Sequence, residues 1–226
     1  MGFVARLFNV FVSPRETFEA VRERPAWVVP FIIIILITAG TTYFMTPLTA
    51  DMQKDLIENR MENMGASDEQ IEDALERAEG NQIAGVIGGA VSVAIMLIVG
   101  GLIWLFVSNT ILGGEATFGQ MMGVNVYRYF IMLVGLLIKL PIMLSQQTIN
   151  IHFSLAKLFM DEASMNTFLY KFLANIELFN LWSIAVLIVG IATVIRVNIS
   201  KVWPWAAVLF LIYYLAVSGI QSAIGF

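Results

Sequence analysis

Apolar residues along this 226-residue chain gather in five long runs, which polar segments separate. The runs cover residues 27–45, 83–112, 124–144, 178–195 and 203–224. A helix needs about 17–25 apolar residues to cross the hydrocarbon layer of a bilayer. Four of the runs fall within that range, and the run 83–112 exceeds it. Residues 31–36 are mostly β-branched and would favour a strand in water, but a lone strand in lipid leaves its amides unpaired. The pattern therefore predicts five transmembrane helices.

The polar segment 47–82 lies between the first two runs and carries ten acidic residues against three basic ones. Its apolar residues recur at helical spacing on either side of Gly65. Ser67 and Gln70 form the pattern of a capping box, in which each side chain bonds the other residue's backbone N–H. We expect an acidic hairpin of two amphipathic helices outside the membrane.

Residues 1–26 precede the first run and are predicted to form an amphipathic interfacial segment. Ser13 and Glu16 have capping-box spacing, and Pro14 would occupy the first helical position. In the helix that follows, Phe18 and Val21 fall on one side and charged residues largely on the other, which suits a membrane surface. The chain thus divides into this segment and a membrane domain, residues 27–226, that includes the acidic hairpin.

Composition supports the membrane assignment and narrows the chemistry. The chain is 58% hydrophobic and 13% charged, with a mean hydropathy of +0.80, whereas soluble domains are about 45–50% apolar and about 25% charged. A net charge of −4 argues against a nucleic-acid partner. The chain contains no cysteine, and it shows no nucleophile motif, phosphate-binding glycine loop or paired carboxylates within a span. We therefore expect no enzymatic activity, no cofactor and no metal site.

The distribution of lysine and arginine predicts the orientation. Seven of these residues lie on the side of the N-terminus and six on the other side, where the loops are much longer. Because cytoplasmic loops are denser in positive charge, the N-terminus is expected in the cytoplasm. Five spans would then place the C-terminus and the acidic hairpin outside.

Four short stretches resemble the Yip family of Ypt/Rab-interacting integral membrane proteins. They are Ser-Pro-Arg-Glu-Thr-Phe at 13–18, Arg-Pro-Ala-Trp at 24–27, Gly-Gly-Glu-Ala-Thr-Phe-Gly-Gln at 113–120 and Glu-Leu-Phe-Asn-Leu-Trp at 177–182. The resemblance implies a five-helix membrane domain with a cytoplasmic N-terminus. In eukaryotes such proteins associate with Rab-type GTPases and with one another. The short region ahead of the first span and the acidic hairpin look more like prokaryotic relatives, which favours a bacterial plasma membrane over a Rab-linked role.

Six polar residues are candidate functional positions within or beside the spans: Asn109, Glu115, Arg128, Lys139, Glu177 and Asn180. Lys139 is the formal charge farthest inside a run, so it either contacts a substrate or lipid headgroup or extends its ammonium to the surface. Arg128 would mark the entrance of the third span, and Glu177 and Asn180 that of the fourth.

Convergence of Glu115, Arg128 and Asn180 would create a small polar pocket, although the expected topology places Asn180 on the opposite side. Ordinary anchoring at the interface is the simpler interpretation. His152, the single histidine, has no cluster of ligands beside it and is expected on a short interfacial helix between spans three and four.

Two functional hypotheses follow. The first is a non-enzymatic membrane scaffold that contacts lipids or other membrane proteins, either as an oligomer or as a subunit of a complex. The alternative is a small transporter or channel for a lipid or another small substrate between spans two, three and four. A transporter should contain a water-accessible cavity near Lys139, Asn109 or Gln146, whereas a scaffold should have a closed apolar interior.

Overall fold

The computed structural model of the chain describes residues 1–79, 82–149, 151, 153–160, 164 and 167–223. Over these residues the fold is all-α, as the sequence predicts. The helices form two compact units, which we describe separately. The first unit comprises Met1–Phe31, Leu97–Leu136 and His152–Phe226, and the second comprises Ile32–Met96 and Leu137–Ile151.

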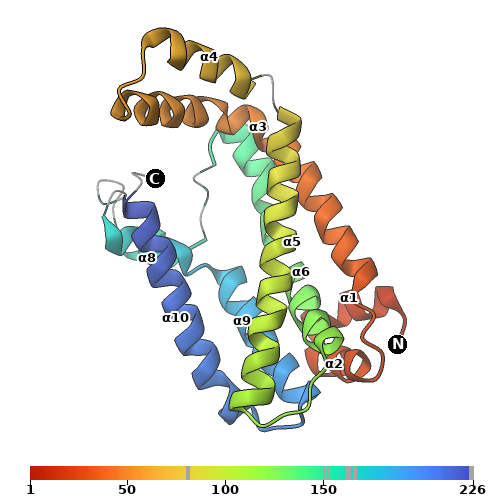
Figure 1. Cartoon of the computed structure of the whole chain (residues 1–226). Coiled ribbons are helices and arrows are strands. Elements are labelled where there is room, and N and C mark those ends of the chain that lie inside the picture. The colour runs from red at the N-terminus through yellow and green to blue at the C-terminus, as the bar shows by residue number, and fades with distance from the viewer. Residues whose placement is uncertain (80–81, 150, 152, 161–163, 165–166, 224–226) are drawn as a thin grey trace. The chain divides into compact units, whose positions relative to one another are not determined.

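The elements follow one another along the chain as Figure 1 labels them. They are α1 (Phe3–Val12), α2 (Pro14–Glu23), α3 (Val28–Asn63), α4 (Asp68–Glu79), α5 (Gln82–Phe106), the π-helical turn η1 (Val107–Ile111), α6 (Phe118–Gln146), α7 (Leu155–Phe159), α8 (Phe168–Asn175), α9 (Leu178–Val194) and α10 (Ile199–Ala223).

Four helical segments in the described part of the chain are long and apolar enough to cross a membrane: Val28–Ala50, Ile83–Ile111, Phe118–Gln146 and Ile199–Ser222. They correspond to four of the five predicted spans and confirm a polytopic membrane protein. The remaining predicted span is α9, a shorter apolar helix of 17 residues. At 1.5 Å per residue α9 is about 26 Å long, slightly less than the hydrocarbon thickness of about 30 Å. That α9 crosses as a fifth span stays a prediction.

The first span and the first helix of the acidic hairpin are one helix, α3, of 36 residues. The sequence predicted two separate elements here. Pro47 lies inside α3, where it removes a backbone N–H and crowds the preceding turn, the usual cause of a helix bend. Figure 1 shows α3 as a continuous ribbon, red to orange, that changes direction along its length.

The turn between α3 and α4 follows the sequence prediction. Gly65 has φ +75°, a left-handed conformation that glycine adopts without steric penalty, and it lies two residues after Asn63, the last residue of α3. The capping box forms as expected: the Ser67 N–H donates to Gln70 Oε1 at 2.9 Å, and the Gln70 N–H donates to Ser67 Oγ at 3.4 Å. The predicted break at Gly65 is confirmed.

Helix α6 begins at Phe118, six residues before the predicted start of the third span at residue 124. A second capping box starts it: the Thr117 N–H donates to Gln120 Oε1 at 2.8 Å, and the Gln120 N–H donates to Thr117 Oγ1 at 3.3 Å. Hydropathy alone did not predict this extension, because polar residues around position 120 interrupt the apolar run. As a result Arg128 lies ten residues inside α6 rather than at its entrance.

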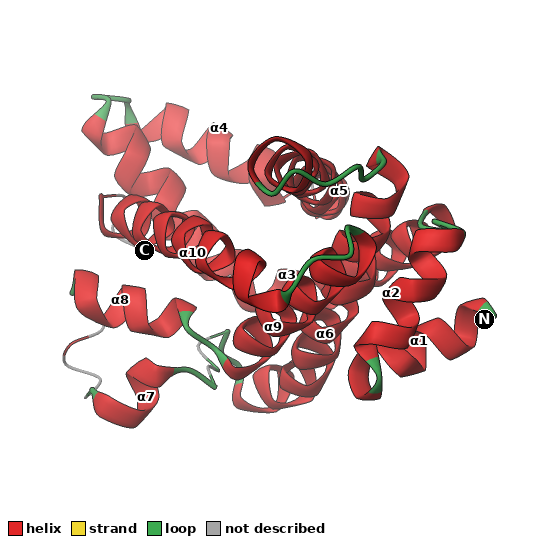
Figure 2. Ribbon diagram, turned by 90° about the horizontal axis from the view of Figure 1, so that it is seen from below, coloured by secondary structure: helices red, strands yellow, loops and turns green. Residues whose placement is uncertain are grey.

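The N-terminal segment contains two helices, of which the sequence predicted only α2. Pro14 opens α2, as expected, and Phe18 and Val21 share its apolar side. The structure buries that side in the core of the first unit. The predicted capping box at Ser13 is wrong, because the Ser13 side chain makes no cap bond and the Glu16 carboxylate instead accepts from Asn9 Nδ2 at 3.2 Å. Figure 2 shows α1 and α2 side by side, and α2 packs against both α1 and α9.

A continuous apolar core fills the first unit. Phe18 and Val21 of α2 meet Val124 and Tyr127 of α6 there, together with Leu187 and other residues of α9 and α10. Gly190 of α9 allows this close approach: a Cβ there would lie 2.7 Å from Val124 Cγ1 and 3.0 Å from Phe18 Cε2. Carbon atoms pack best at about 3.5–4.0 Å, so a side chain at 190 would push the three helices apart.

Candidate functional site

Arg128 donates hydrogen bonds to two neighbouring side chains in the first unit. Its Nε donates to Asn125 Oδ1 at 2.9 Å, one turn earlier on α6. Its Nη1 donates to Ser183 Oγ of α9, also at 2.9 Å. Arg128 is partly buried, whereas Asn125 and Ser183 are almost completely buried. The guanidinium thus joins α6 to α9 through charge-assisted hydrogen bonds.

Asn125 extends this connection to a third helix. Its Nδ2 donates to the Leu97 carbonyl of α5 at 2.8 Å. The approach is possible because residue 100 is a glycine, since a Cβ there would lie 2.8 Å from Asn125 Nδ2. The Asn125 amide thus donates to α5 and accepts from Arg128 of its own helix, which ties α5 to α6 inside an apolar interior.

An aromatic ring of α10 completes what we call the Arg128 cluster, namely Asn125, Arg128, Ser183 and Phe210. The Arg128 guanidinium carbon lies 5.7 Å from the centroid of the Phe210 ring, within the range of a cation–π interaction. Among the residues that the structure describes, no carboxylate pairs with Arg128. Neutral oxygens and an aromatic face therefore stabilise the charge, and the cluster connects α5, α6, α9 and α10.

Asn109 fastens the loop between η1 and α6. Its Nδ2 donates to the Ala116 carbonyl at 2.9 Å, and its Oδ1 accepts from the Ala116 N–H at 2.7 Å. Gly114 lets this loop approach α9, because a Cβ there would lie 2.8 Å from side-chain carbons of Ile195. Glu115 is exposed on the same loop. Asn109 is thus a loop clamp, and Glu115 lies on the surface.

Glu177 and Asn180 lie at the opposite end of α9 from that loop. Glu177 is the N-cap residue of α9, is buried, and forms an isolated antiparallel bridge with Ser154. Asn180 Nδ2 donates to the Asn175 carbonyl at 2.9 Å, which ties the start of α9 to the end of α8. Both residues connect local backbone segments.

The five predicted positions in the first unit do not share one set of contacts. The bridge of Glu177 with Ser154, the hydrogen bond of Asn180 to Asn175, the Asn109 clamp and the Arg128 cluster are separate sets of contacts. Among the described residues, no hydrogen bond or ion pair joins Glu115, Arg128 and Asn180 into the predicted pocket. Lys139 is partly buried in α6 and belongs to the second unit, whereas the other five belong to the first. His152 lies outside the described residues.

Sequence reasoning missed several partners of these residues. Ser183 gives no signal of its own, because a serine inside an apolar run is common in membrane helices. Gln120 closes the α6 capping box and also donates from Nε2 to the Arg22 carbonyl at 2.8 Å; its Thr-x-x-Gln spacing could have revealed the first role. Arg6 is also buried, and its Nη1 donates to the Arg24 carbonyl at 2.8 Å, which nothing in the sequence near it signals.

A further connection links α8 to α10. Lys171 is buried, and its Nζ donates to the Gln221 carbonyl near the C-terminal end of α10 at 3.0 Å. A cation at the carbonyl end of a helix compensates both the unpaired carbonyls and the helix dipole. Asn175 adds hydrogen bonds from Nδ2 to Ser218 Oγ and to Gln221 Oε1, both at 3.2 Å.

Comparison with known proteins agrees with this architecture. The model of the Yip1 domain family matches residues 8–220. The chain is also similar to membrane protein YknW of Bacillus subtilis (strain 168), with 26% identity over 223 residues that cover 96% of this chain and 91% of the relative. No solved structure gives a significant match. A family match over almost the whole chain, together with its four long apolar helices, shows that the protein is a multi-pass membrane protein of the Yip1 domain family.

Proposed function

We propose that the protein is a non-enzymatic membrane scaffold that acts through contacts with other membrane proteins or with lipids. The observation that carries this proposal is that polar side chains in the first unit form hydrogen bonds with other parts of the protein. Asn109, Asn125 and Arg128 direct their hydrogen bonds to other parts of the protein. A transport path instead needs polar groups that face a hydrated passage and exchange partners with a substrate.

The outer surfaces fit such a role. On α10 the large apolar side chains of Val208, Leu211, Ile212 and Leu215 are exposed, and α5 exposes a similar series in the second unit. In a bilayer these faces contact acyl chains or neighbouring membrane helices, for which close van der Waals packing drives association. Association with a second copy or with another membrane protein is part of the proposal.

The orientation is also proposed. The density of positive charge in the short loops supports a cytoplasmic N-terminus. The first span would then place the acidic hairpin outside a bacterial plasma membrane, and a membrane-crossing α9 would place the C-terminus outside as well. Because the chain has no cysteine, single cysteines report topology without background. Glu69→Cys should react with an impermeant maleimide in intact cells, whereas Glu115→Cys should react only after the membrane is opened.

The scaffold proposal is tested by comparing partner retention with transport. The tagged chain is purified in mild detergent from its own host, beside an unrelated tagged membrane protein of similar size. The proposal expects a membrane protein or defined lipid at constant stoichiometry with the chain alone. Recovery of the chain without partners, combined with uptake of a small substrate by vesicles that contain only this protein, would instead support the transporter hypothesis.

A further inference from the structure

The two N-terminal helices present outer faces of opposite polarity. Arg6 is the only charged residue of α1, and it is turned inward with 5% of its surface exposed. Val4 and Phe8 are each 73% exposed and Val12 is 70% exposed. A spacing of four residues places these three side chains on one side of the helix. The outer face of α1 is therefore a stripe of large apolar side chains.

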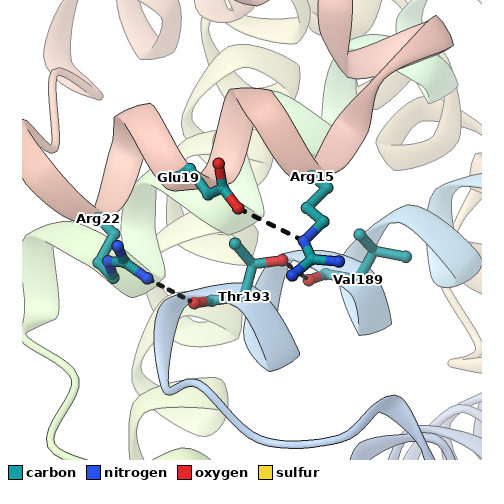
Figure 3. Close-up of polar contacts among 5 residues, drawn as sticks. All are labelled: Arg15, Glu19, Arg22, Val189 and Thr193. Atoms are coloured by element: carbon teal, nitrogen blue, oxygen red, sulfur yellow. Dashed lines mark hydrogen bonds and ion pairs between the residues drawn. The ribbon is translucent and has the colours of Figure 1, made fainter.

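The outer face of α2 is charged. Arg15 Nε lies 3.4 Å from Glu19 Oε1 in an ion pair whose two side chains are largely exposed. Figure 3 shows this pair on α2, together with Arg22, whose Nη1 donates to the Thr193 carbonyl of α9 at 3.5 Å. Exposed ion pairs of this kind are stable in water or among headgroups and unfavourable in hydrocarbon.

Contacts with α9 show that the two helices lie at different levels along it. Arg22 of α2 reaches Thr193, near the C-terminal end of α9. Phe11 of α1 packs edge-on against Trp182, with ring centroids 5.7 Å apart, near the N-terminal end. Eleven residues separate these contact points, which corresponds to about 16 Å along the helix. In Figure 1, α1 correspondingly lies farther than α2 from the loop that joins α9 and α10.

The apolar stripe of α1 continues onto α9. Leu178, Leu181 and Trp182 are exposed beside the contact of Phe11 with Trp182, at 62%, 48% and 38%. The inward hydrogen bond from Arg6 to the Arg24 carbonyl directs the one charged side chain of α1 away from its outer face. The backbone groups in the middle of α1 pair within the helix, as immersion in lipid requires.

We infer that α1 lies in the acyl-chain region of one leaflet, with Val4, Phe8 and Val12 in contact with lipid, while α2 lies among the headgroups of the same leaflet. The occupant of the stripe is thus lipid acyl chains. This contact specifies one lipid surface of the proposed scaffold. The role of this contact rests on the scaffold proposal. The depth of α1 in the membrane does not, because it is measured without any partner.

The test uses the absence of cysteine in the chain. Phe8→Cys is labelled with nitrobenzoxadiazole and reconstituted in lipid nanodiscs, which leave both membrane faces open to solution. Lipids that carry a nitroxide on the acyl chain should remove most of the fluorescence, and aqueous iodide should remove little. Glu19→Cys on α2 is the matched control and should show the reverse. Val4→Cys and Val12→Cys, at the same face, guard against a local effect of one substitution.

Each variant should retain the gel-filtration profile and thermal transition of the cysteine-free parent before its label is interpreted. Quenching of the labels at positions 4, 8 and 12 by iodide and not by the nitroxide lipids would overturn the inference, because the stripe would then face water. Protection from both quenchers, with cross-linking at position 8 between two copies of the chain, would also overturn it, since protein would cover the stripe. Neither result bears on whether a partner is retained, so the scaffold proposal is judged separately.

Discussion

The bond between Arg128 and Ser183 gives the most quantitative prediction. Ser183→Ala removes one hydroxyl from a fully buried position and leaves the Arg128 Nη1 without its acceptor. Arg128→Met removes the charge, both of its side-chain hydrogen bonds and the contact with Phe210, while it keeps an apolar side chain of similar length. Combining the two substitutions isolates the energy of the single bond.

The expected magnitude follows from the chemistry of the pair. Hydrogen bonds to charged groups contribute about 1.5–3 kcal/mol in soluble proteins. Bonds between membrane helices average about 0.6 kcal/mol and reach about 1.7 kcal/mol, because helices separated in the membrane find other partners. The 2.9 Å distance and the positive charge place this bond near the upper membrane value. We expect Ser183→Ala to lower the free energy of unfolding by about 1–2 kcal/mol.

The measurement is unfolding in mixed micelles as the fraction of sodium dodecyl sulfate rises, followed by circular dichroism. Ser145→Ala is a matched control, because Ser145 is an exposed residue of α6 whose hydroxyl donates within its own helix, to the Ile142 carbonyl at 3.0 Å. It should change stability by less than about 0.5 kcal/mol. In the Arg128→Met background, Ser183→Ala should lose most of its effect. An equal loss of stability with and without the arginine would refute the interpretation of Ser183 as its acceptor.

Three further substitutions test other contacts. Gly190→Ala should lower the free energy of unfolding by about 1–3 kcal/mol, because its Cβ would lie 2.7 Å from a carbon of α6. The control Gly88→Ala, with open space around it, should be neutral or stabilise by up to about 1 kcal/mol. Equal effects of the two substitutions would contradict the close packing at Gly190. Asn109→Ala removes both bonds to Ala116 and should speed amide exchange in the loop before α6, whereas unchanged exchange would mean that the clamp is not needed. Lys171→Met should raise amide exchange in the last turn of α10 with little effect on α6, and a uniform loss of protection would show a global rather than a capping role.

The spans could be predicted from the sequence because the physics of the bilayer is local. A run of about 20 apolar residues must form a helix in lipid, whatever the rest of the chain does. Local chemistry also placed the turn at Gly65 and the start of α4 at Ser67. The same reasoning failed at Ser13, because the side chain of Glu16 found a different donor, Asn9.

The arrangement of the polar residues could not be predicted, because their partners are distant in the sequence. Arg128 bonds a serine 55 residues away, and Arg6 bonds a carbonyl 18 residues away. The missed helix α1 has the same origin: its ten residues would be marginal in isolation, and packing of Val10 and Arg6 stabilises it. The bend of α3 could not be predicted from hydropathy, because hydropathy reports the preference of a segment for lipid and not the direction of the helix axis.

The central claim is that the polar residues inside the first unit fasten helices together and do not line a hydrated path. It is tested most directly by the reactivity of single cysteines in lipid nanodiscs. Ser183→Cys and Ser108→Cys replace side chains with no exposed surface, and Glu115→Cys replaces an exposed one. The account predicts that a small water-soluble maleimide labels Glu115→Cys rapidly and labels the two interior cysteines only after denaturation. Rapid labelling of Ser183→Cys in the folded protein would contradict it, because water would then reach the Arg128 cluster.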